Sequence, residues 1–244
     1  MRTNYKLQRL YCDSPLAKNL TIGISAEQAH YLLRVLRMRD GDEVLVFNGR
    51  DGEWRSTLRL DGRKKALLNL TKCERPQTQA PDLVFCFAPL KTGRLDYLVQ
   101  KAVEMGAGTI QPVITHHTQI TKFGEKRLRA NIIEAAEQCG VLFIPELKKA
   151  LKFETFLDGW NTKRRLIFCD EACEDNNPID RLNKTGKAPI GLLIGPEGGF
   201  SDQERQRLMA SPFATSIPLG PRILRADTAA VAALAVVQAT IGDW

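Results

Sequence analysis

The spacing of hydrophobic residues predicts several strands and one helix in the first third of the chain, residues 1–73. The helix follows Ser25, which forms a capping box with Gln28 and precedes apolar residues at helical spacing. Asn-Gly and Asp-Gly pairs mark tight turns between apolar runs, so we expect strands over residues 7–11, 43–47, 53–60 and 66–71. Short strands joined by tight turns around one helix are typical of a small β-barrel-like domain.

The pattern changes after residues 74–82, a polar segment with two prolines and no periodicity, which we interpret as a linker. In residues 83–244, buried-strand runs alternate with helical periods. The expected strands are residues 83–88, 109–114, 165–169, 190–194 and 215–219. The expected helices are residues 94–105, 126–139, 202–209 and 228–239, the last with Asp227 as its N-cap. This alternation predicts an α/β domain whose parallel sheet is covered on both faces.

Positive charge is concentrated in the first third of the chain. Of the net charge of +7, residues 1–73 contribute +6, with 14 Lys and Arg against 8 Asp and Glu. This asymmetry suggests a module that binds a polyanion, and an ordinary basic surface explains it equally well.

The apolar and cysteine residues argue against other classes of protein. The longest apolar stretch, residues 229–237, is too short to span a bilayer, so we expect no membrane partner. The cysteines are scattered and lack zinc-site spacing, which favours reduced thiols in the cytoplasm over disulfides or a metal site. They are Cys12, Cys73, Cys86, Cys139, Cys169 and Cys173.

Two similar glycine-bearing loops lie near the end of the chain, in residues 192–201 and 217–228. Each begins as an apolar run, breaks at Gly-Pro and leads into a helical pattern, which suggests one ligand site built from both. Neither loop is a dinucleotide fingerprint or a phosphate-binding loop with its lysine, so neither a dinucleotide nor a nucleoside triphosphate is favoured. Taken alone, the first loop is equally well explained as a tight structural connection.

Polar residues in the second loop are the strongest candidates for chemistry. Arg222, Arg225 and Asp227 follow a strand end. Asp227 has a simple structural role as a helix N-cap. Arg225 has no such explanation, because the helix dipole disfavours a cation beside a helix N-terminus, so it is the better functional candidate.

Five stretches together resemble the SPOUT methyltransferases, and within them the family that methylates N3 of a uridine in 16S ribosomal RNA. They occur in the family's order and span nearly the whole chain. The stretches are HYLLRVLRMRDGDEVLVFNG at residues 30–49, KAVEMG at 101–106, EAAEQCG at 134–140, LLIGPEGG at 192–199 and LGPRILRADT at 219–228.

The resemblance implies a PUA-like RNA-binding domain in residues 1–73, a linker in residues 74–82 and a SPOUT domain with a trefoil knot in residues 83–244. It implies S-adenosylmethionine as cofactor, 16S rRNA or the assembled small ribosomal subunit as substrate, and a homodimer with the alanine-rich last helix near the interface. The implied cofactor-binding residues are Leu193, Ile194, Gly195, Glu197, Gly198, Gly199, Ile217, Leu219, Gly220 and Leu224.

For catalysis, the expected role of Arg225, with Arg222 as second choice, is to stabilise negative charge on a uracil carbonyl once N3 has lost its proton. Asp227 or Glu197 would orient the arginine or accept that proton. Phosphate contacts are expected from Arg9, Arg34, Arg37, Arg39 and Lys91.

The chain departs from the family's pattern at two places, and these departures leave one alternative hypothesis for its function. Val141, Leu142 and Phe143 stand where arginine is expected, as do His116 and His117, and both changes remove cations near the expected active site. The alternative is a non-catalytic RNA-binding factor for ribosome assembly, which a titration with S-adenosylmethionine would separate from an enzyme.

Overall fold

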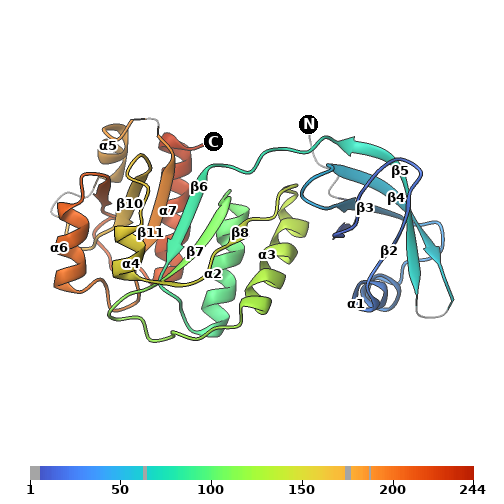
Figure 1. Ribbon diagram of the computed structural model, residues 1–244, viewed down its shortest axis with the longest axis horizontal. Helices are drawn as coiled ribbons and strands as arrows, with labels where there is room; N and C mark the ends of the chain where they lie inside the picture. The colour runs from blue at the N-terminus through green and yellow to red at the C-terminus, as the bar shows by residue number, and fades with distance from the viewer. Residues whose placement is uncertain (1–5, 63–64, 174–176, 187) are drawn as a thin grey trace. The chain divides into compact units, whose positions relative to one another are not determined.

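A computed structural model describes residues 6–62, 65–173, 177–186 and 188–244 of the chain (Figure 1). The chain divides into two compact units. The N-terminal unit comprises Met1–Gln79 and Ala136–Ile144, and the C-terminal unit comprises Ala80–Ala135 and Pro145–Trp244.

The N-terminal unit is built on a five-stranded sheet with the order β1-β3-β4-β5-β2. Its strands are β1 (Arg9–Tyr11), β2 (Thr21–Gly23), β3 (Glu43–Phe47), β4 (Glu53–Leu60) and β5 (Ala66–Arg75). Helix α1 (Ala26–His30) continues as one turn of π-helix, η1 (Tyr31–Val35). The capping box between Ser25 and Gln28 is confirmed. Apolar side chains of the strands, α1 and η1 form one core, in which Leu32, Val44 and Leu68 are fully buried.

Two features of this sheet differ from the sequence prediction. Strand β2 was not expected, because its three residues are too few to show a period. Strand β5 runs to Arg75, beyond residue 71 and into the segment interpreted as a linker, because it pairs with β4 as far as Glu53. The units divide between Gln79 and Ala80, inside residues 74–82.

A buried ion network binds residues 136–144 into the N-terminal unit. Glu53 is only 1% exposed and accepts hydrogen bonds from Nε of Arg9 at 2.7 Å and Nε of Arg75 at 2.7 Å. Nη1 and Nη2 of Arg9 donate to the carbonyl oxygens of residues 136, 137 and 141 at 2.6–3.0 Å. Arg9 is therefore a buried structural residue, which corrects the expectation that it contacts RNA.

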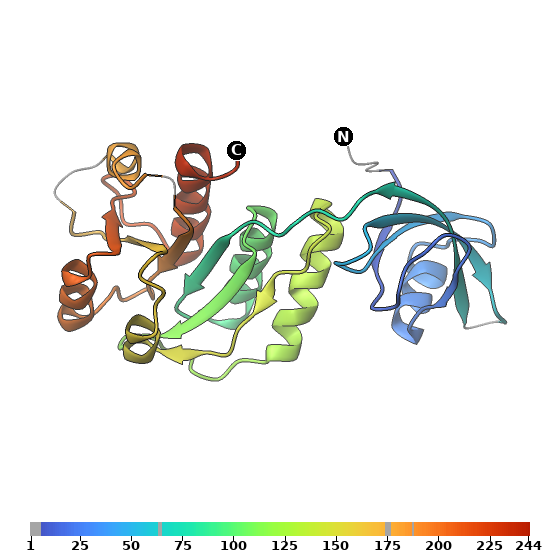
Figure 2. The same ribbon diagram turned by 45° about the horizontal axis from the view of Figure 1, so that its top comes forward.

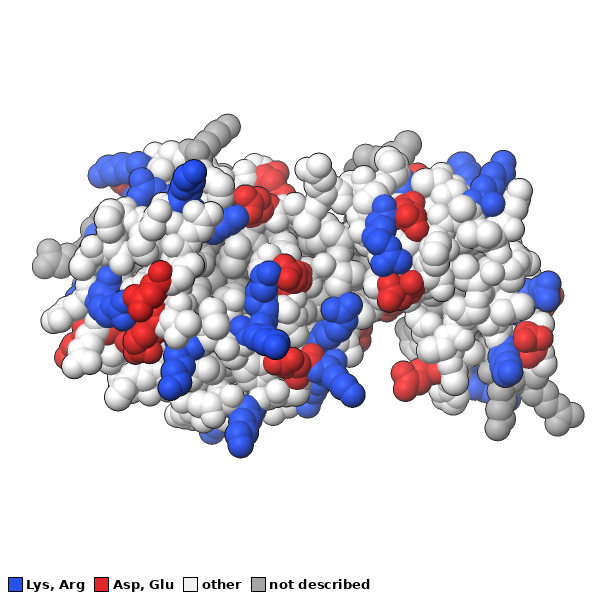
Figure 3. All heavy atoms as spheres, viewed as in Figure 1, with Lys and Arg blue, Asp and Glu red and all other residues white. Residues whose placement is uncertain are grey.

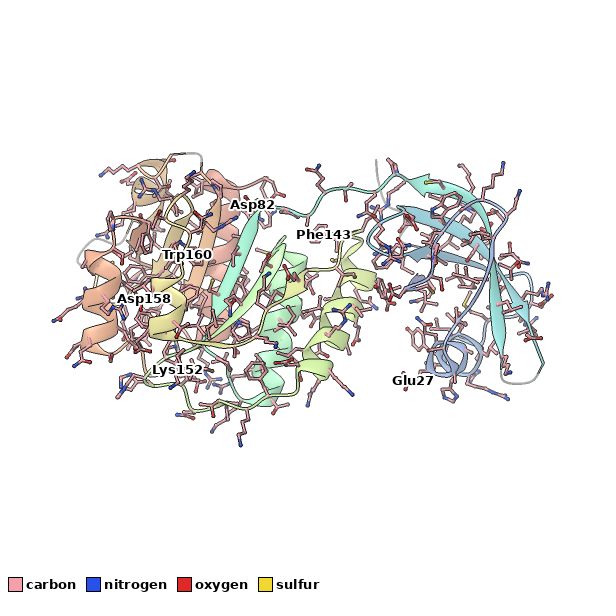
Figure 4. All side chains as sticks on the ribbon, in the orientation of Figure 1. Glu27, Asp82, Phe143, Lys152, Asp158 and Trp160 are labelled. Carbon is pink, nitrogen blue, oxygen red and sulfur yellow. The ribbon has the colours of Figure 1, made fainter. Side chains whose placement is uncertain are left out.

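The same segment contains the residues that replace the expected arginines. Leu142 is 1% exposed and Phe143, labelled in Figure 4, is 9% exposed. Both belong to the N-terminal unit, where apolar side chains suit burial.

The C-terminal unit is built on seven strands, all paired in parallel. They are β6 (Leu83–Phe87), β7 (Thr109–Ile114), β8 (Glu146–Leu147), β9 (Leu151–Lys152), β10 (Arg165–Cys169), β11 (Ile190–Ile194) and β12 (Ala214–Ile217). Their order is β12-β10-β11-β6-β7-β8, and β9 also pairs with β7. The predicted parallel sheet is confirmed, while the two-residue strands β8 and β9 were not foreseen.

Helices cover both faces of this sheet. They are α2 (Thr92–Glu104), α3 (Glu125–Cys139), α4 (Phe153–Asp158), α5 (Pro178–Asn183), α6 (Asp202–Ala210) and α7 (Ala226–Ile241). Helix α7 packs against α2, α5 and β11, whereas α4 lies on the opposite face and contacts β7 (Figures 1 and 2). No helix among the described residues is long and apolar enough to cross a bilayer.

The start of α7 differs from the prediction. Its N-cap is Arg225, which makes no side-chain capping hydrogen bond, and Asp227 lies inside the first turn. The expectation that Asp227 caps this helix was therefore wrong. A carboxylate in the first turn is still favoured by the helix dipole.

Close packing on β11 depends on glycine at residue 191, which has no side chain. A Cβ atom built on Gly191 would lie 2.3 Å from Cη2 of Trp160, which is labelled in Figure 4. The indole Nε1 of Trp160 donates to the carbonyl oxygen of Arg164 at 2.9 Å and fixes the ring there. Glycine at residue 191 therefore lets Trp160 pack against the strand that leads into the first glycine loop.

Candidate active site

Five neighbouring strands of the parallel sheet end at one edge of the C-terminal unit. The strand order places β10 between β12 and β11, and β6 and β7 follow next. Parallel strands bring their carboxyl ends to the same edge, which is where α/β proteins usually bind ligands. The two glycine loops, which follow β11 and β12, therefore lie on either side of the loop after β10.

A cavity of about 380 Å³ lies between these three loops. Its volume is within the usual range for small-molecule sites. The lining residues come from the ends of β10 and β11, from the loops after β10, β11 and β12, and from the starts of α6 and α7. Both glycine loops thus contribute to one cavity.

Most of the expected cofactor residues line this cavity. They are Ile194, Gly195, Glu197, Gly199, Leu219, Gly220 and Leu224. Leu193 and Ile217 are fully buried in their strands, so they support the loops from beneath. Gly198 does not line the cavity, and its Cα faces Cβ of His117.

The glycines of the first loop have separate structural reasons. Gly199 has a φ of +70°, a conformation that L side chains rarely adopt, and its N–H donates to the carbonyl oxygen of Pro196 at 2.9 Å. A Cβ on Gly195 would lie 3.1 Å from the ring of Phe200, and one on Gly198 would lie 3.3 Å from Cβ of His117. Of these three glycines, only Gly199 has a positive φ.

Sequence reasoning missed the third wall of the cavity, the loop after β10. Asp170, Glu171 and Cys173 line it. Asp170 is 7% exposed and accepts hydrogen bonds from Nε of Arg205 on α6, at 3.1 Å to each carboxylate oxygen. This ion pair raises the pKa of Arg205 and fixes α6 against the cavity. An Asp-Glu pair directly after a strand was the available signal, but the strand order was needed to interpret it.

The thiol of Cys169, at the end of β10, also reaches the cavity. Burial raises its pKa to about 12, with further contributions from the neighbouring Cys173 and Asp170. The thiol therefore stays neutral at physiological pH, so Cys169 is an inert part of the wall rather than a nucleophile.

The three catalytic candidates lie together at the start of α7. Arg222 lines the cavity, whereas Arg225 and Asp227 do not. Arg222 and Arg225 are both exposed, and Asp227 is half-buried. Glu197 lines the cavity and forms an ion pair with Arg94 on α2, so its carboxylate already has a cationic partner.

The remaining RNA-binding candidates are exposed. Arg34, Arg37 and Arg39 lie in and after η1 of the N-terminal unit, and Lys91 is the N-cap of α2 in the C-terminal unit. Among the described residues, no group of three His, Cys, Asp or Glu side chains could hold a metal ion.

Two family models match the chain. An RNA methyltransferase domain matches residues 77–238, and an RNA methyltransferase PUA domain matches residues 24–71. Among curated relatives, ribosomal RNA small subunit methyltransferase E of Rickettsia conorii is 32% identical over 236 residues, covering 96% of each chain. The protein of the same name from Synechocystis is 31% identical, covering 91% of this chain and 74% of its own length.

Solved structures show the same fold. A Legionella pneumophila protein, named as a methyltransferase with the cofactor SAM bound, superposes with a TM-score of 0.82 at 29% identity. The match covers 96% of this chain and 97% of that one. A Neisseria gonorrhoeae structure superposes with a TM-score of 0.84 at 24% identity, covering 98% and 99%, and supports the fold alone.

Proposed function

The chain belongs to the RNA methyltransferase family, and on this premise we propose that it transfers a methyl group from S-adenosylmethionine to N3 of a uridine in 16S rRNA. The observation that carries the proposal is the single cavity between the two glycine loops and the loop after β10. The relatives named above act on small-subunit ribosomal RNA. No observation favours the alternative of a non-catalytic assembly factor.

The cavity suits S-adenosylmethionine in size and in charge. Its volume of about 380 Å³ is adequate for a folded nucleoside with an amino-acid tail. Its carboxylates outnumber its cations, which favours a cationic ligand; the lining includes Asp170, Glu171, Glu197 and Asp202 against Arg205 and Arg222. When bound, S-adenosylmethionine supplies an electrophilic methyl group on a sulfonium.

The residues of the chain position and polarise the reactants. Backbone groups of Gly195–Gly199 and Leu219–Leu224 hold the methyl donor, while Arg225, with Arg222 as second choice, faces a carbonyl oxygen of the uracil ring. Loss of the N3 proton spreads negative charge onto the ring oxygens, and a fixed guanidinium stabilises that charge. Because N3 lies on the pairing edge, the target base is bound unpaired or flipped out.

The proposed RNA surface of the N-terminal unit centres on Arg37. Its φ is +56°, and the N–H of the following Met38 closes the end of η1 by donating to Leu32. This left-handed position is one that glycine normally occupies, and an arginine there costs about 1–2 kcal/mol. On the face shown in Figure 3, basic and acidic side chains are interspersed.

Replacing Arg37 by glycine is expected to weaken RNA binding without loss of stability. The substitution relieves backbone strain and removes one phosphate contact, so the slope of log Kd against log salt falls by about 0.9. Filter binding of a 16S rRNA fragment over a salt series measures this slope. The matched control is Asn19→Gly, which relieves a positive φ of 67° and changes no charge. An unchanged slope in Arg37→Gly contradicts the RNA-binding role.

The proposal also includes the trefoil knot and the homodimer that the resemblance implies. Helix α7 buries Ala230, Ala233 and Val237 within its own unit. Four of its partly exposed positions in the middle of the helix are also small and apolar, namely Val231, Ala232, Ala235 and Val236. A second copy of α7 would cover this stripe, and light scattering during gel filtration tests for a dimer.

The activity is tested by incubating the protein with S-adenosylmethionine and either naked 16S rRNA or small ribosomal subunits. We expect N3-methyluridine in the nucleoside digest, detected by mass spectrometry, and heat of binding in a titration with S-adenosylmethionine. A protein that binds RNA but neither binds the donor nor forms the modified nucleoside supports the assembly-factor alternative instead.

A further inference from the structure

A second, smaller hollow lies on the other side of the first glycine loop. The loops after β6, β7 and β11 form it, and it shares Pro196 and Glu197 with the larger cavity. Its lining comprises Pro89, Leu90, Lys91, His117, Gln119, Ile120, Pro196 and Glu197. Its volume of about 10 Å³ means that a flat ring would lie over it rather than inside it. One short stretch of chain therefore separates a methyl-donor cavity from a surface that suits a planar group.

His117 contacts the first glycine loop, which is the stretch of chain between the two hollows. Its Nδ1 lies 3.1 Å from the carbonyl oxygen of Gly199, and its Cβ packs against Gly198. A carbonyl oxygen only accepts hydrogen bonds, so Nδ1 carries the hydrogen. In the neutral ring Nε2 then holds a free lone pair, and no hydrogen bond to Nε2 is found among the described residues.

Hydrogen bonds and a ring contact brace the loop that carries His117. The N–H of Thr115 donates to Oγ1 of Thr118 at 2.9 Å, and the N–H of His116 donates to Oε1 of Glu204 at 2.8 Å. The rings of His116 and His117 pack edge to face with centroids 4.9 Å apart. These contacts hold the imidazole of His117 in one place, as proton transfer requires.

The rest of the hollow matches the chemistry of uracil. Pro89 and Leu90 are buried and, with the half-buried Ile120, form the apolar part of the lining. The Gln119 amide and the Lys91 ammonium provide hydrogen-bond donors for ring carbonyls. We propose that this hollow is the subsite for the target uracil and that His117 Nε2 is the base that removes its N3 proton. This inference rests on the proposed methyltransferase function.

The charged groups around His117 fit this role. Glu197 faces the hollow and forms an ion pair with Arg94, so its carboxylate already has a partner. Lys91 comes from the start of α2, and its positive charge favours an anionic uracil. The other titratable groups nearby are His116, whose backbone N–H binds Glu204, and Glu171, which lies against Gly199.

Proton transfer to His117 precedes methyl transfer to N3. The N3–H bond of uracil breaks and leaves its electron pair on N3, while the lone pair of His117 Nε2 forms the new N–H bond. The N3 electron pair then takes the methyl group, and the bond from that carbon to sulfur breaks with its pair remaining on sulfur. The imidazolium of His117 finally releases its proton to water.

Replacing His117 by asparagine removes the proposed base, Nε2, and keeps a donor for the hydrogen bond to Gly199. The asparagine amide N–H can still reach the Gly199 carbonyl oxygen, but the variant has no group in place of Nε2. We expect kcat for rRNA methylation to fall by about 10²- to 10⁴-fold. Calorimetry should show unchanged binding of S-adenosylmethionine, and the fall of the natural rate on the acidic side of its pH profile should disappear. His30→Asn is the matched control and should keep the natural rate, because His30 is an exposed histidine at the end of α1 in the N-terminal unit.

A natural kcat and pH profile in His117→Asn would overturn the inference while leaving the methyltransferase proposal intact. Failure of the natural protein to bind the donor or to methylate rRNA would instead reject the proposed function.

A second test of the role of His117 uses NMR and does not depend on turnover. The chain has only three histidines, so their imidazole ¹⁵N signals can be assigned by single substitutions. We expect His117 in the tautomer with hydrogen on Nδ1, and a shift of its Nε2 signal when uridine monophosphate is added. A hydrogen on Nε2 in the neutral ring, or no response to uridine monophosphate at high concentration, would contradict the assignment.

Discussion

Replacing Arg225 by alanine is expected to lower kcat for rRNA methylation by about 10²- to 10³-fold, the usual effect of removing one donor to a developing oxyanion. Arg225 is the N-cap of α7, is exposed and makes no capping hydrogen bond. The dipole of a 16-residue helix disfavours a cation at this end, so removing it should not destabilise the fold. Arg225 also does not line the cavity, so the Kd for S-adenosylmethionine should not change.

Single-turnover kinetics measures the expected loss of rate, and calorimetry on the same preparation measures the expected unchanged Kd for S-adenosylmethionine. Arg225→Lys should recover part of the rate, because it restores the charge but not the planar arrangement of donors. Arg207→Ala is the control, since Arg207 is an exposed arginine of α6 that pairs with Asp158 and does not line the cavity. If Arg222→Ala loses the rate and Arg225→Ala does not, the catalytic role belongs to Arg222.

Replacing Glu53 by glutamine is expected to destabilise the N-terminal unit by about 3–5 kcal/mol, because it leaves two arginines with no carboxylate partner in the network. Glu53 is 1% exposed and accepts hydrogen bonds from both Arg9 and Arg75. The same arginines hold the carbonyl oxygens of residues 136–137 and 140–141. Loss of the carboxylate should therefore loosen this segment as well as the sheet.

The destabilisation caused by Glu53→Gln should depend on pH. Burial alone would raise the pKa of Glu53, but the hydrogen bonds and charges of Arg75 and Arg9 outweigh it, and the net pKa is lowered. Its stabilisation is therefore complete above the pKa of an unfolded glutamate, about 4.3, and is lost as pH falls through the lower folded value. The difference between the natural protein and Glu53→Gln should shrink in the same range.

Hydrogen exchange followed by mass spectrometry, at neutral and acidic pH, resolves this change within the N-terminal unit. The matched control is Glu43→Gln in strand β3, which removes a half-exposed ion pair with Arg55 and should cost about 0–1 kcal/mol. Equal protection of residues 136–144 in the natural protein and in Glu53→Gln would show that the network does not hold the segment.

Much of the architecture could be predicted from local pattern. Strands β3, β4, β7, β10 and β11 begin and end where the apolar runs do, because alternation and buried runs are properties of neighbouring residues. The capping boxes at Ser25 and Ser201 were also readable, since each depends on two side chains three positions apart. The two glycine loops were also recognisable, because each is a local pattern of an apolar run, a Gly-Pro break and a helical period.

Errors arose where a residue's role depends on distant partners. Arg9 looks like a surface cation in sequence, and only the approach of Glu53 and residues 136–144 makes it a buried structural residue. Asp170 has no distinctive pattern around it in the sequence, and only the fold places it in the cavity wall and beside Arg205, 35 positions later. A buried charge is stable only with partners to neutralise it, and those partners are brought together by the fold.

The sequence by itself determined the longer elements, the family and the two loops that carry the ligand site. The tertiary structure decided which strand ends are neighbours, and with them the third cavity wall and the position of His117 beside Gly199. The physical reason is that periodicity is set by adjacent residues, whereas strand order is set by long-range pairing and burial. His117 therefore gained a functional interpretation only when β7 and β11 were both placed beside β6.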